Sequence, residues 1–175
     1  MKKKILVLGA SGMLGVEVLR ELLNKNTTLY ATIRNISDKN KIKNYLNSDI
    51  SKVKFYKFKI KKNYEKNLEK IVRNKHIVIN CIGVIKPYIK ENNEKSVSNA
   101  LNINSIFPHV LKSKLSKNSK VYQIATDCVF NGDKGWYNEN VSHNANDIYG
   151  KTKSLGEVKS DNFYNIRCSI IGKEI

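Results

Sequence analysis

Lys4-Ile5-Leu6-Val7-Leu8-Gly9-Ala10-Ser11-Gly12-Met13-Leu14-Gly15, near the amino terminus, is the stretch that decides the fold. Its apolar run from Ile5 to Leu8 is typical of a strand buried on both faces of a parallel sheet. After the glycines, Leu14, Val18 and Leu22 recur at the four-residue spacing of an amphipathic helix. The stretch therefore predicts a strand, a tight turn and a helix.

The three glycines predict that this turn binds a nucleotide. Gly9 allows the tight turn, Gly12 lets the backbone approach a pyrophosphate, and Gly15 lets the helix pack close to the strand. N–H groups at the helix start would face the phosphates, with the positive end of the helix dipole behind them. The spacing is Gly-x-x-Gly-x-x-Gly, not Gly-x-Gly-x-x-Gly. The strand before it and the helix after it favour nucleotide binding over an ordinary strand-to-helix connection.

Length and composition indicate one domain, residues 1–175, with a sizeable core. Because the chain has no apolar span of transmembrane length and no signal peptide, we expect a cytoplasmic protein without a membrane partner. The cysteines, Cys81, Cys128 and Cys168, are odd in number and widely separated. That spacing fits neither a disulfide framework nor a metal site, so we interpret them as small buried hydrophobes.

The net charge of +17 raises the question of nucleic-acid binding. Only four of the 32 basic residues are arginine, and the lysines are spread along the chain instead of clustering. The most lysine-rich segment, residues 52–62, is typical of an edge strand that lysines protect from pairing. We therefore expect no nucleic-acid partner, although the charge favours anionic ligands.

Apolar runs alternate with helical patterns along the rest of the chain. Further strands are expected at 28–33, 52–62, 76–83, 121–126 and 164–171. Residues 35–51 form a loop or a short surface helix, and a long helix over 92–117 is interrupted by Pro108, which cannot donate to the Asn104 carbonyl. This alternation predicts an α/β fold: a doubly wound parallel sheet in the order 3-2-1-4-5-6 with helices on both faces.

Two strand ends are candidates for contact with the cofactor. Arg34 follows the second strand, where an acidic residue would bind a ribose 2′-hydroxyl and an arginine accommodates a 2′-phosphate. No Asp or Glu occurs there before Asp38, which favours NADP over NAD. Asn80 and Gly83 end the fourth strand, so they would lie under the cofactor crevice.

Tyr149 and Lys153 are the candidate chemical groups. Four residues apart on a helix, they project from one face. An ammonium beside a phenol lowers the phenol pKa, and such a phenol can pass a proton to a developing alkoxide. Thr126 adds a hydroxyl at the end of a neighbouring strand.

These motifs resemble those of the extended short-chain dehydrogenase/reductases, and most of all the dTDP-4-dehydrorhamnose reductases. The resemblance covers essentially the whole chain. The matching segments are Gly9 to Gly15, Asn80-Cys81-Ile82-Gly83, Asn102-Ile103-Asn104 with Phe107-Pro108, Ala125 to Gly132, and Tyr149-Gly150-Lys151-Thr152-Lys153 with Gly156-Glu157.

The resemblance implies hydride transfer from NADPH to the 4-keto carbon of a nucleotide-linked sugar. Tyr149 would donate the proton, Lys153 would lower its pKa and hold the nicotinamide ribose, Thr126 would bind the carbonyl oxygen, and Asn104 would support a proton relay. It also implies NADP(H) binding, with NAD(H) second, by Gly9, Ser11, Gly12, Met13, Leu14, Gly15, Arg34, Asn80, Cys81, Gly83, Tyr149 and Lys153. No metal is expected, and a homodimer is left open.

The sequence departs from the family at several positions. Cys128 replaces a usual Tyr, Ala125 a usual Ser, and residues 59–63 lack an acidic residue expected near the adenine. Family members continue beyond the sixth strand into a smaller substrate lobe, which we expect to be absent from residues 1–175. Two alternatives therefore stay open: a non-catalytic nucleotide-binding or regulatory module, and a sugar-nucleotide epimerase or dehydratase. The dehydratases have a Glu where this chain has Cys128.

Overall fold

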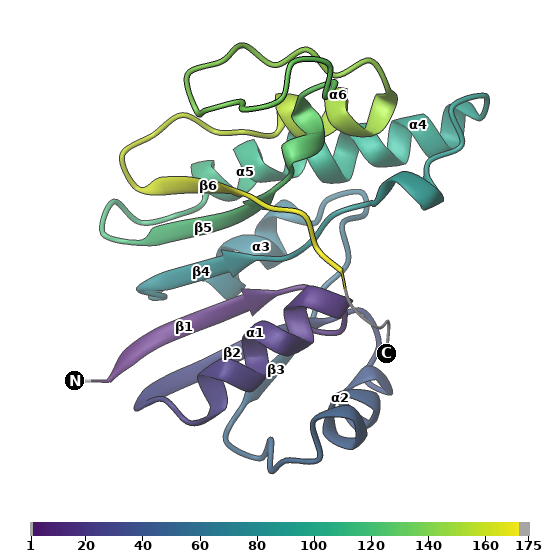
Figure 1. Cartoon of the computed structure of the whole chain (residues 1–175). Coiled ribbons are helices and arrows are strands. Elements are labelled where there is room, and N and C mark those ends of the chain that lie inside the picture. The colour runs from purple at the N-terminus through teal and green to yellow at the C-terminus, as the bar shows by residue number, and fades with distance from the viewer. Residues whose placement is uncertain (1, 172–175) are drawn as a thin grey trace.

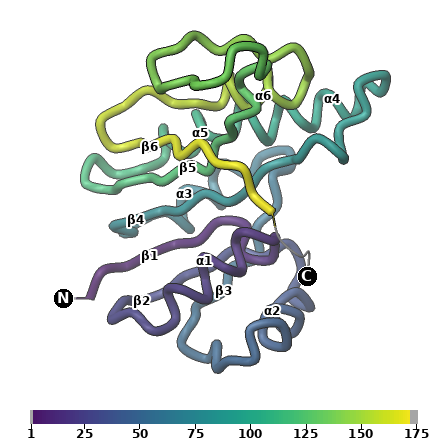
Figure 2. Tube along the Cα trace, viewed as in Figure 1, coloured from purple at the N-terminus to yellow at the C-terminus, as the bar shows by residue number. Residues whose placement is uncertain are grey.

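The computed structural model describes residues 2–171 of the chain. Within that range the strands form one parallel six-stranded sheet in the order β3-β2-β1-β4-β5-β6, which confirms the predicted topology. Figure 1 shows the sheet with its covering helices, and Figure 2 traces the same path from purple to yellow. The strands are β1 (Lys3–Leu8), β2 (Thr27–Ile33), β3 (Lys54–Lys57), β4 (Ile77–Asn80), β5 (Lys120–Ala125) and β6 (Phe163–Arg167). The helices are α1 (Met13–Leu23), α2 (Asp38–Leu46), α3 (Glu65–Val72), α4 (Glu94–Ala100), α5 (Phe107–Ser113) and α6 (Ile148–Leu155).

Helices pack on both faces of the sheet because β1 is apolar on both sides. Ile5 and Val7 face a cluster with α1 and α2, whereas Leu6 and Leu8 face a cluster with α3 and α5. All four side chains are buried. Figure 1 accordingly shows α1 in front of the sheet and α3 and α5 behind it. None of the helices within residues 2–171 is long and apolar enough to span a membrane.

Several elements are shorter than the sequence predicts. β3 covers only Lys54–Lys57 of the lysine-rich segment, because only these residues pair with β2. It lies at the edge of the sheet, as expected. β4 and β6 also end earlier than predicted, at Asn80 and Arg167. Of the two alternatives for residues 35–51, the helical one is correct, because α2 forms there.

The predicted helix over 92–117 is divided by a π-helical turn, Leu101–Ile106, between α4 and α5. There the Phe107 N–H donates to the Asn102 carbonyl, five residues back. Pro108 cannot donate a hydrogen bond, so the wider turn places it in the first turn of α5, where the missing N–H costs nothing. The predicted interruption is therefore a change from α-helical to π-helical hydrogen bonding just before Pro108.

On the side of α1, the last two strands have no helix in front of them in the part of the chain that Figure 1 draws as placed. Tyr122 of β5 and Tyr164 of β6 stack there with ring centroids 5.3 Å apart. Tyr164 is 40% exposed and Ile166 43%. The prediction of helices on both faces thus holds fully for the β1 region, whereas β5 and β6 are covered on one face.

Candidate active site

The glycine turn joins β1 to α1 and is tied to β2. Gly9 has φ +77°, a conformation that side chains rarely adopt. Its N–H donates to the Thr32 hydroxyl oxygen at 2.9 Å, and the next N–H, of Ala10, donates to the Thr32 carbonyl at 3.0 Å. Sequence reasoning missed Thr32. The available signal was a polar residue among the apolar residues of a buried strand.

Gly12 and Gly15 differ in what surrounds them. A Cβ at Gly15 would lie 2.1 Å from the Gly9 carbonyl oxygen, so only glycine lets α1 pack against the turn this closely. At Gly12 the nearest atom to such a Cβ is 3.5 Å away, and no side chain caps α1. N–H groups at an uncapped helix start, beside a residue that has no side chain, suit a phosphate. The turn, which includes Ser11, Met13 and Leu14, therefore fits the pyrophosphate of a dinucleotide.

The end of β4 forms the next wall of the site. Asn80 is fully buried, donates to the Gln123 amide oxygen at 2.7 Å and accepts from the Ile82 N–H at 3.1 Å. Its amide therefore holds the turn after β4 in shape, and its contact with a cofactor stays a prediction. Cys81 lies in this turn, close to Gly9, and burial raises the pKa of its thiol to about 12. Gly83 is exposed.

Thr126, Tyr149 and Lys153 come together beside this turn. Thr126 directly follows β5, and its hydroxyl hydrogen-bonds Tyr149 in the first turn of α6. Lys153, one turn further along α6, donates from Nζ to the Ile124 carbonyl at 2.7 Å. A Cβ added to Gly83 would lie 3.7 Å from that Nζ, so the lysine also borders the β4 turn.

Burial controls the electrostatics of the pair. It raises the pKa of the Tyr149 phenol, and the hydrogen bond from Thr126 opposes this only in part. Burial also lowers the pKa of Lys153 to about 8. The prediction that Lys153 lowers the phenol pKa is therefore wrong for the chain as the structure shows it. Spacing on a helix identifies neighbours, whereas removal from water penalises the charged form of each group.

Asn104 joins the β4 turn to α6. It is 3% exposed, accepts from the Val84 N–H at 2.8 Å and donates to the Val84 carbonyl at 2.9 Å and the Thr152 hydroxyl at 3.2 Å. Its own carbonyl lies against Gly156, where a Cβ would be 1.9 Å from the oxygen. The side chain is thus a brace between two parts of the site. Thr152, which sequence reasoning did not single out, completes the brace.

Arg34 lies in a different part of the molecule, exposed at the end of β2. Lys59, which follows β3, donates from Nζ to the Asn35 side-chain oxygen at 2.9 Å. Two cations therefore stand at the adjacent ends of β2 and β3. Sequence reasoning noted Lys59 as part of the lysine-rich edge segment 52–62 and of a segment that lacks an acidic residue, and did not connect it with Arg34.

The interpretation of the cysteines as buried hydrophobes is wrong for Cys128. Its side chain is exposed after β5, whereas Cys81 and Cys168 are half-buried. Cys128 belongs to a short 3₁₀ turn, Asp127–Val129, in which Val129 is buried while Cys128 faces outward. Among residues 2–171, no three His, Cys, Asp or Glu side chains gather closely enough to hold a metal ion.

Comparison with known proteins places these features in a family. Residues 2–171 match the family described as the RmlD substrate binding domain. The zebrafish (Danio rerio) methionine adenosyltransferase 2 subunit beta is 26% identical over 156 residues, which are 89% of this chain and 42% of that protein. The chain therefore spans less than half the length of that curated relative.

Solved structures share the fold. UDP-glucuronic acid 4-epimerase from Bacillus cereus in complex with NAD superposes with a TM-score of 0.71 at 20% identity, over 87% of this chain and 50% of that one. ElxO with NADP bound gives 0.67 at 16% identity, over 89% and 64%. The expected resemblance to the dTDP-4-dehydrorhamnose reductase-like proteins is thereby confirmed: this chain belongs to the RmlD substrate-binding domain family.

Proposed function

We propose that residues 1–175 supply the cofactor side of a cytoplasmic NADP(H)-dependent reductase that acts on a keto group of a nucleotide-linked sugar. The observation that carries this proposal is the grouping of Thr126, Tyr149 and Lys153 at the carboxyl end of β5 and the first turns of α6. A module that only binds a nucleotide has no need of a phenol, a hydroxyl and an amine at one place.

Each residue then has a defined task. The glycine turn and the start of α1 hold the pyrophosphate, and Arg34 meets the 2′-phosphate. NADPH supplies the hydride when bound. Thr126 donates a hydrogen bond to the keto oxygen, and Tyr149 gives it a proton. Lys153 holds the nicotinamide ribose.

Asn104 acts through its neighbours. Its contacts with Val84 and Thr152 hold the β4 turn and α6 in one arrangement, so it is a positioning residue for Lys153 and Tyr149. The raised pKa of Tyr149 keeps the phenol protonated near neutral pH, which is the form that a proton donor requires.

Tyr149→Phe tests the proposal. The variant retains the ring and loses only the hydroxyl, so we expect NADPH affinity within about twofold of the parent protein and at least a 100-fold loss of ketone reduction. Binding is followed by NADPH fluorescence and reduction by NADPH absorbance, with a dTDP-linked 4-keto sugar. Equal turnover by the two proteins would refute the assignment of Tyr149 as proton donor.

A non-catalytic module is the second candidate. It is favoured by the similarity to a protein whose name makes it a subunit of methionine adenosyltransferase, of which the chain spans 42%. The same titration separates the candidates. NADPH binding without any response to nucleotide-sugar, and without turnover, favours the module.

A further inference from the structure

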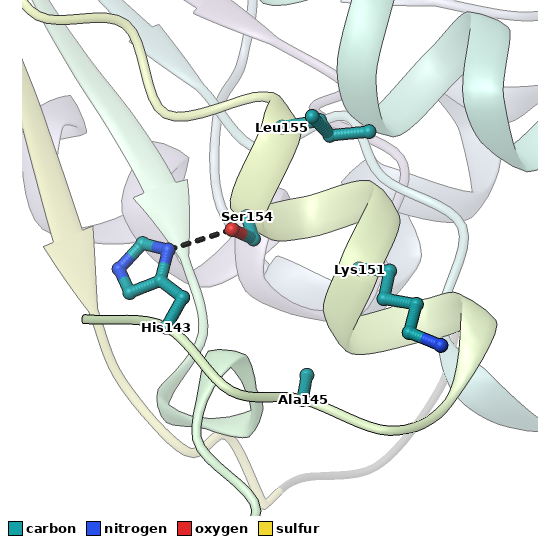
Figure 3. A pocket seen from close by; sticks show the side chains of 5 residues that line it. All are labelled: His143, Ala145, Lys151, Ser154 and Leu155. Atoms are coloured by element: carbon teal, nitrogen blue, oxygen red, sulfur yellow. Dashed lines mark hydrogen bonds between the residues drawn. The ribbon is translucent and has the colours of Figure 1, made fainter.

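His143 lies in the long connection between β5 and α6, outside the group of residues proposed for the reaction. Figure 3 shows its ring pointing toward Ser154 of α6, at the edge of a cavity of about 300 Å³ lined also by Ala145, Lys151 and Leu155. The ring Nδ1 is 2.7 Å from the Ser154 hydroxyl oxygen. One imidazole therefore links this connection directly to the helix that carries Tyr149.

The other ring nitrogen meets β6. Nη2 of Arg167 lies 2.7 Å from Nε2 of His143. The same guanidinium holds Glu157 through two hydrogen bonds of 2.8 Å, and Glu157 lies 3.5 Å from His143 Nε2. The imidazole thus stands between a hydroxyl from α6 and a guanidinium from β6.

The residues 130–147, which we call the 130–147 loop, fold over this contact. The Phe130 ring stacks on Tyr137 at 4.4 Å, meets His143 edge-on at 5.6 Å and lies 5.3 Å from the Arg167 guanidinium carbon. Asn144 returns to Val129 and Asn131 through hydrogen bonds of 2.9–3.1 Å. His143 therefore fastens the middle of the loop to β6 and α6, in addition to the contact of Phe130 with Arg167 and the ion pair of Asp147 with Lys86 at 2.7 Å.

These contacts determine the tautomer of the ring. A guanidinium can only donate, so Nε2 of His143 must accept and carries no proton. The single ring proton is then on Nδ1 and is donated to Ser154. A serine nucleophile activated by this histidine is excluded by the same logic, because the nitrogen that faces the hydroxyl is already protonated.

We propose that neutral His143 is a proton-sensitive latch that holds the 130–147 loop against α6 and β6, and that its protonation releases the loop. A second proton would go to Nε2 and would point at the Arg167 donor, so two cations would face each other at a distance suited to one hydrogen bond. Asp147, the last residue of the loop, caps α6 by accepting from the Gly150 N–H at 2.7 Å, so the loop continues directly into the helix that carries Tyr149.

The charges around the ring favour the neutral form. Burial lowers the pKa of His143 first; Glu157, at the end of α6, opposes this, and Arg167 and Lys159 add to the lowering. Lys151 of α6 lines the neighbouring cavity, and Glu139 of the loop itself acts on Arg167. The unfolded chain takes up the proton near the ordinary value of about 6.5, before the folded chain does. Stability therefore falls as the pH falls from there through the lowered pKa.

The tautomer can be tested on the unaltered protein with ¹⁵N NMR of the imidazole rings. The chain has three histidines, and the other two are internal controls. His76 Nδ1 accepts from the Lys4 N–H, and His109 Nε2 faces the Leu155 carbonyl, so both must carry the proton on Nε2. We expect His143 to be protonated on Nδ1. A proton on Nε2 of His143 would overturn the proposal, and a His143→Gln sample assigns its signals by their loss.

Release of the loop has its own reporter, because Trp136 is the single tryptophan and is completely exposed in the 130–147 loop. As the pH falls, its fluorescence anisotropy should drop in a one-proton step centred below the ordinary histidine pKa of about 6.5. His143→Gln retains an oxygen that can accept from Arg167 and cannot titrate, so the step should be lost, whereas the matched His76→Gln should retain it. A flat profile in the unaltered protein while the His143 signal titrates contradicts the latch. Neither measurement uses activity, so failure of the latch is distinguishable from failure of the proposed reductase.

Discussion

Separate replacement of Gly12 and of Gly15 by alanine tests two different roles of the glycine turn, namely cofactor binding and helix packing. Gly15 has a structural task that the fold already shows, because a Cβ there would meet backbone atoms. A Cβ at Gly12 would make only an ordinary van der Waals contact, 3.5 Å from the Gly9 carbonyl oxygen, so its proposed task concerns the cofactor alone. The two variants should therefore lose different properties.

The cost of Gly15→Ala follows from the contact distance. A Cβ 2.1 Å from the Gly9 carbonyl oxygen forces α1 and the turn apart by about 1 Å, and overpacking of this kind costs about 1–3 kcal/mol. Alanine returns up to about 1 kcal/mol through its higher helix propensity. Both clashing partners are backbone, which favours the upper end. We expect a net loss of about 2 kcal/mol, or a Tm lower by about 4–8 °C for a chain of this size.

For Gly12→Ala the stability terms nearly cancel. Gly12 has φ −88° and ψ 163°, which alanine adopts without strain. Because alanine makes the unfolded chain less flexible, the substitution stabilises the folded protein by about 0.4–1 kcal/mol. Alanine is a poorer N-cap than glycine, and this lowers the stability by a similar amount. NADPH affinity should nevertheless fall at least tenfold, about 1.4 kcal/mol, because the new methyl group occupies the path of the pyrophosphate.

Urea denaturation and NADPH fluorescence titration of both variants complete the test. Gly12→Ala with unaltered stability and unaltered NADPH affinity would refute the proposed grip on the pyrophosphate. Gly15→Ala with unaltered stability would refute the packing argument. The m-value must stay constant in both series, because only then does the midpoint report stability.

Three other predictions concern charge and the brace. Arg34→Asp and Lys59→Gln should each lower affinity for NADPH and leave NADH binding in place; an unchanged NADPH-to-NADH ratio would make both cations ordinary surface charges. Lys153→Met should raise stability by about 1–2 kcal/mol at pH 7, because the shift of the Lys153 pKa from 10.5 to about 8 costs about 3 kcal/mol and the lost hydrogen bond to Ile124 offsets part of it. Between pH 8 and 10.5 the unfolded parent chain still binds the Lys153 proton, whereas the folded chain has lost it, so the stability of the parent protein should rise with pH. The difference in stability between Lys153→Met and the parent protein, measured by urea denaturation, should therefore shrink over the same pH range. Asn104→Ala should cost about 1–3 kcal/mol in the same assay, because it leaves both backbone groups of Val84 without partners.

The sheet order could be predicted because the residues of β1 alone show that this strand is central in a parallel sheet. An apolar run buried on both faces requires helices on both sides, and right-handed crossovers then leave few arrangements. The positions of Gly9 and Gly15 were predictable for the same reason, since a tight turn and a close helix are decided within a few residues. Strand ends were less predictable, because β3 stops where its pairing with β2 stops.

What the sequence could not show depends on partners that are distant along the chain. Thr32 reaches the glycine turn from β2, and Asn104 reaches Val84 and Thr152 from the π-helical turn. The spacing of Tyr149 and Lys153 indicated a pair but not its burial, which reversed the expected direction of the phenol pKa. Local sequence patterns therefore located the candidate groups, whereas burial in the folded structure determined the direction of their pKa shifts.

Burial of Tyr149 and Lys153 has a consequence for the direction of the proposed reaction. The phenol remains protonated at neutral pH, so its ground state is a neutral group that gains little from a nearby cation. With a pKa of about 8, Lys153 is mostly charged at pH 7, and the Ile124 carbonyl holds its Nζ. Its proposed task is therefore to hold the nicotinamide ribose, whereas burial is the main cause that sets the protonation state of Tyr149. Proton donation to a keto oxygen is thus favoured near neutral pH, whereas the reverse reaction would have to begin from a phenolate that burial disfavours.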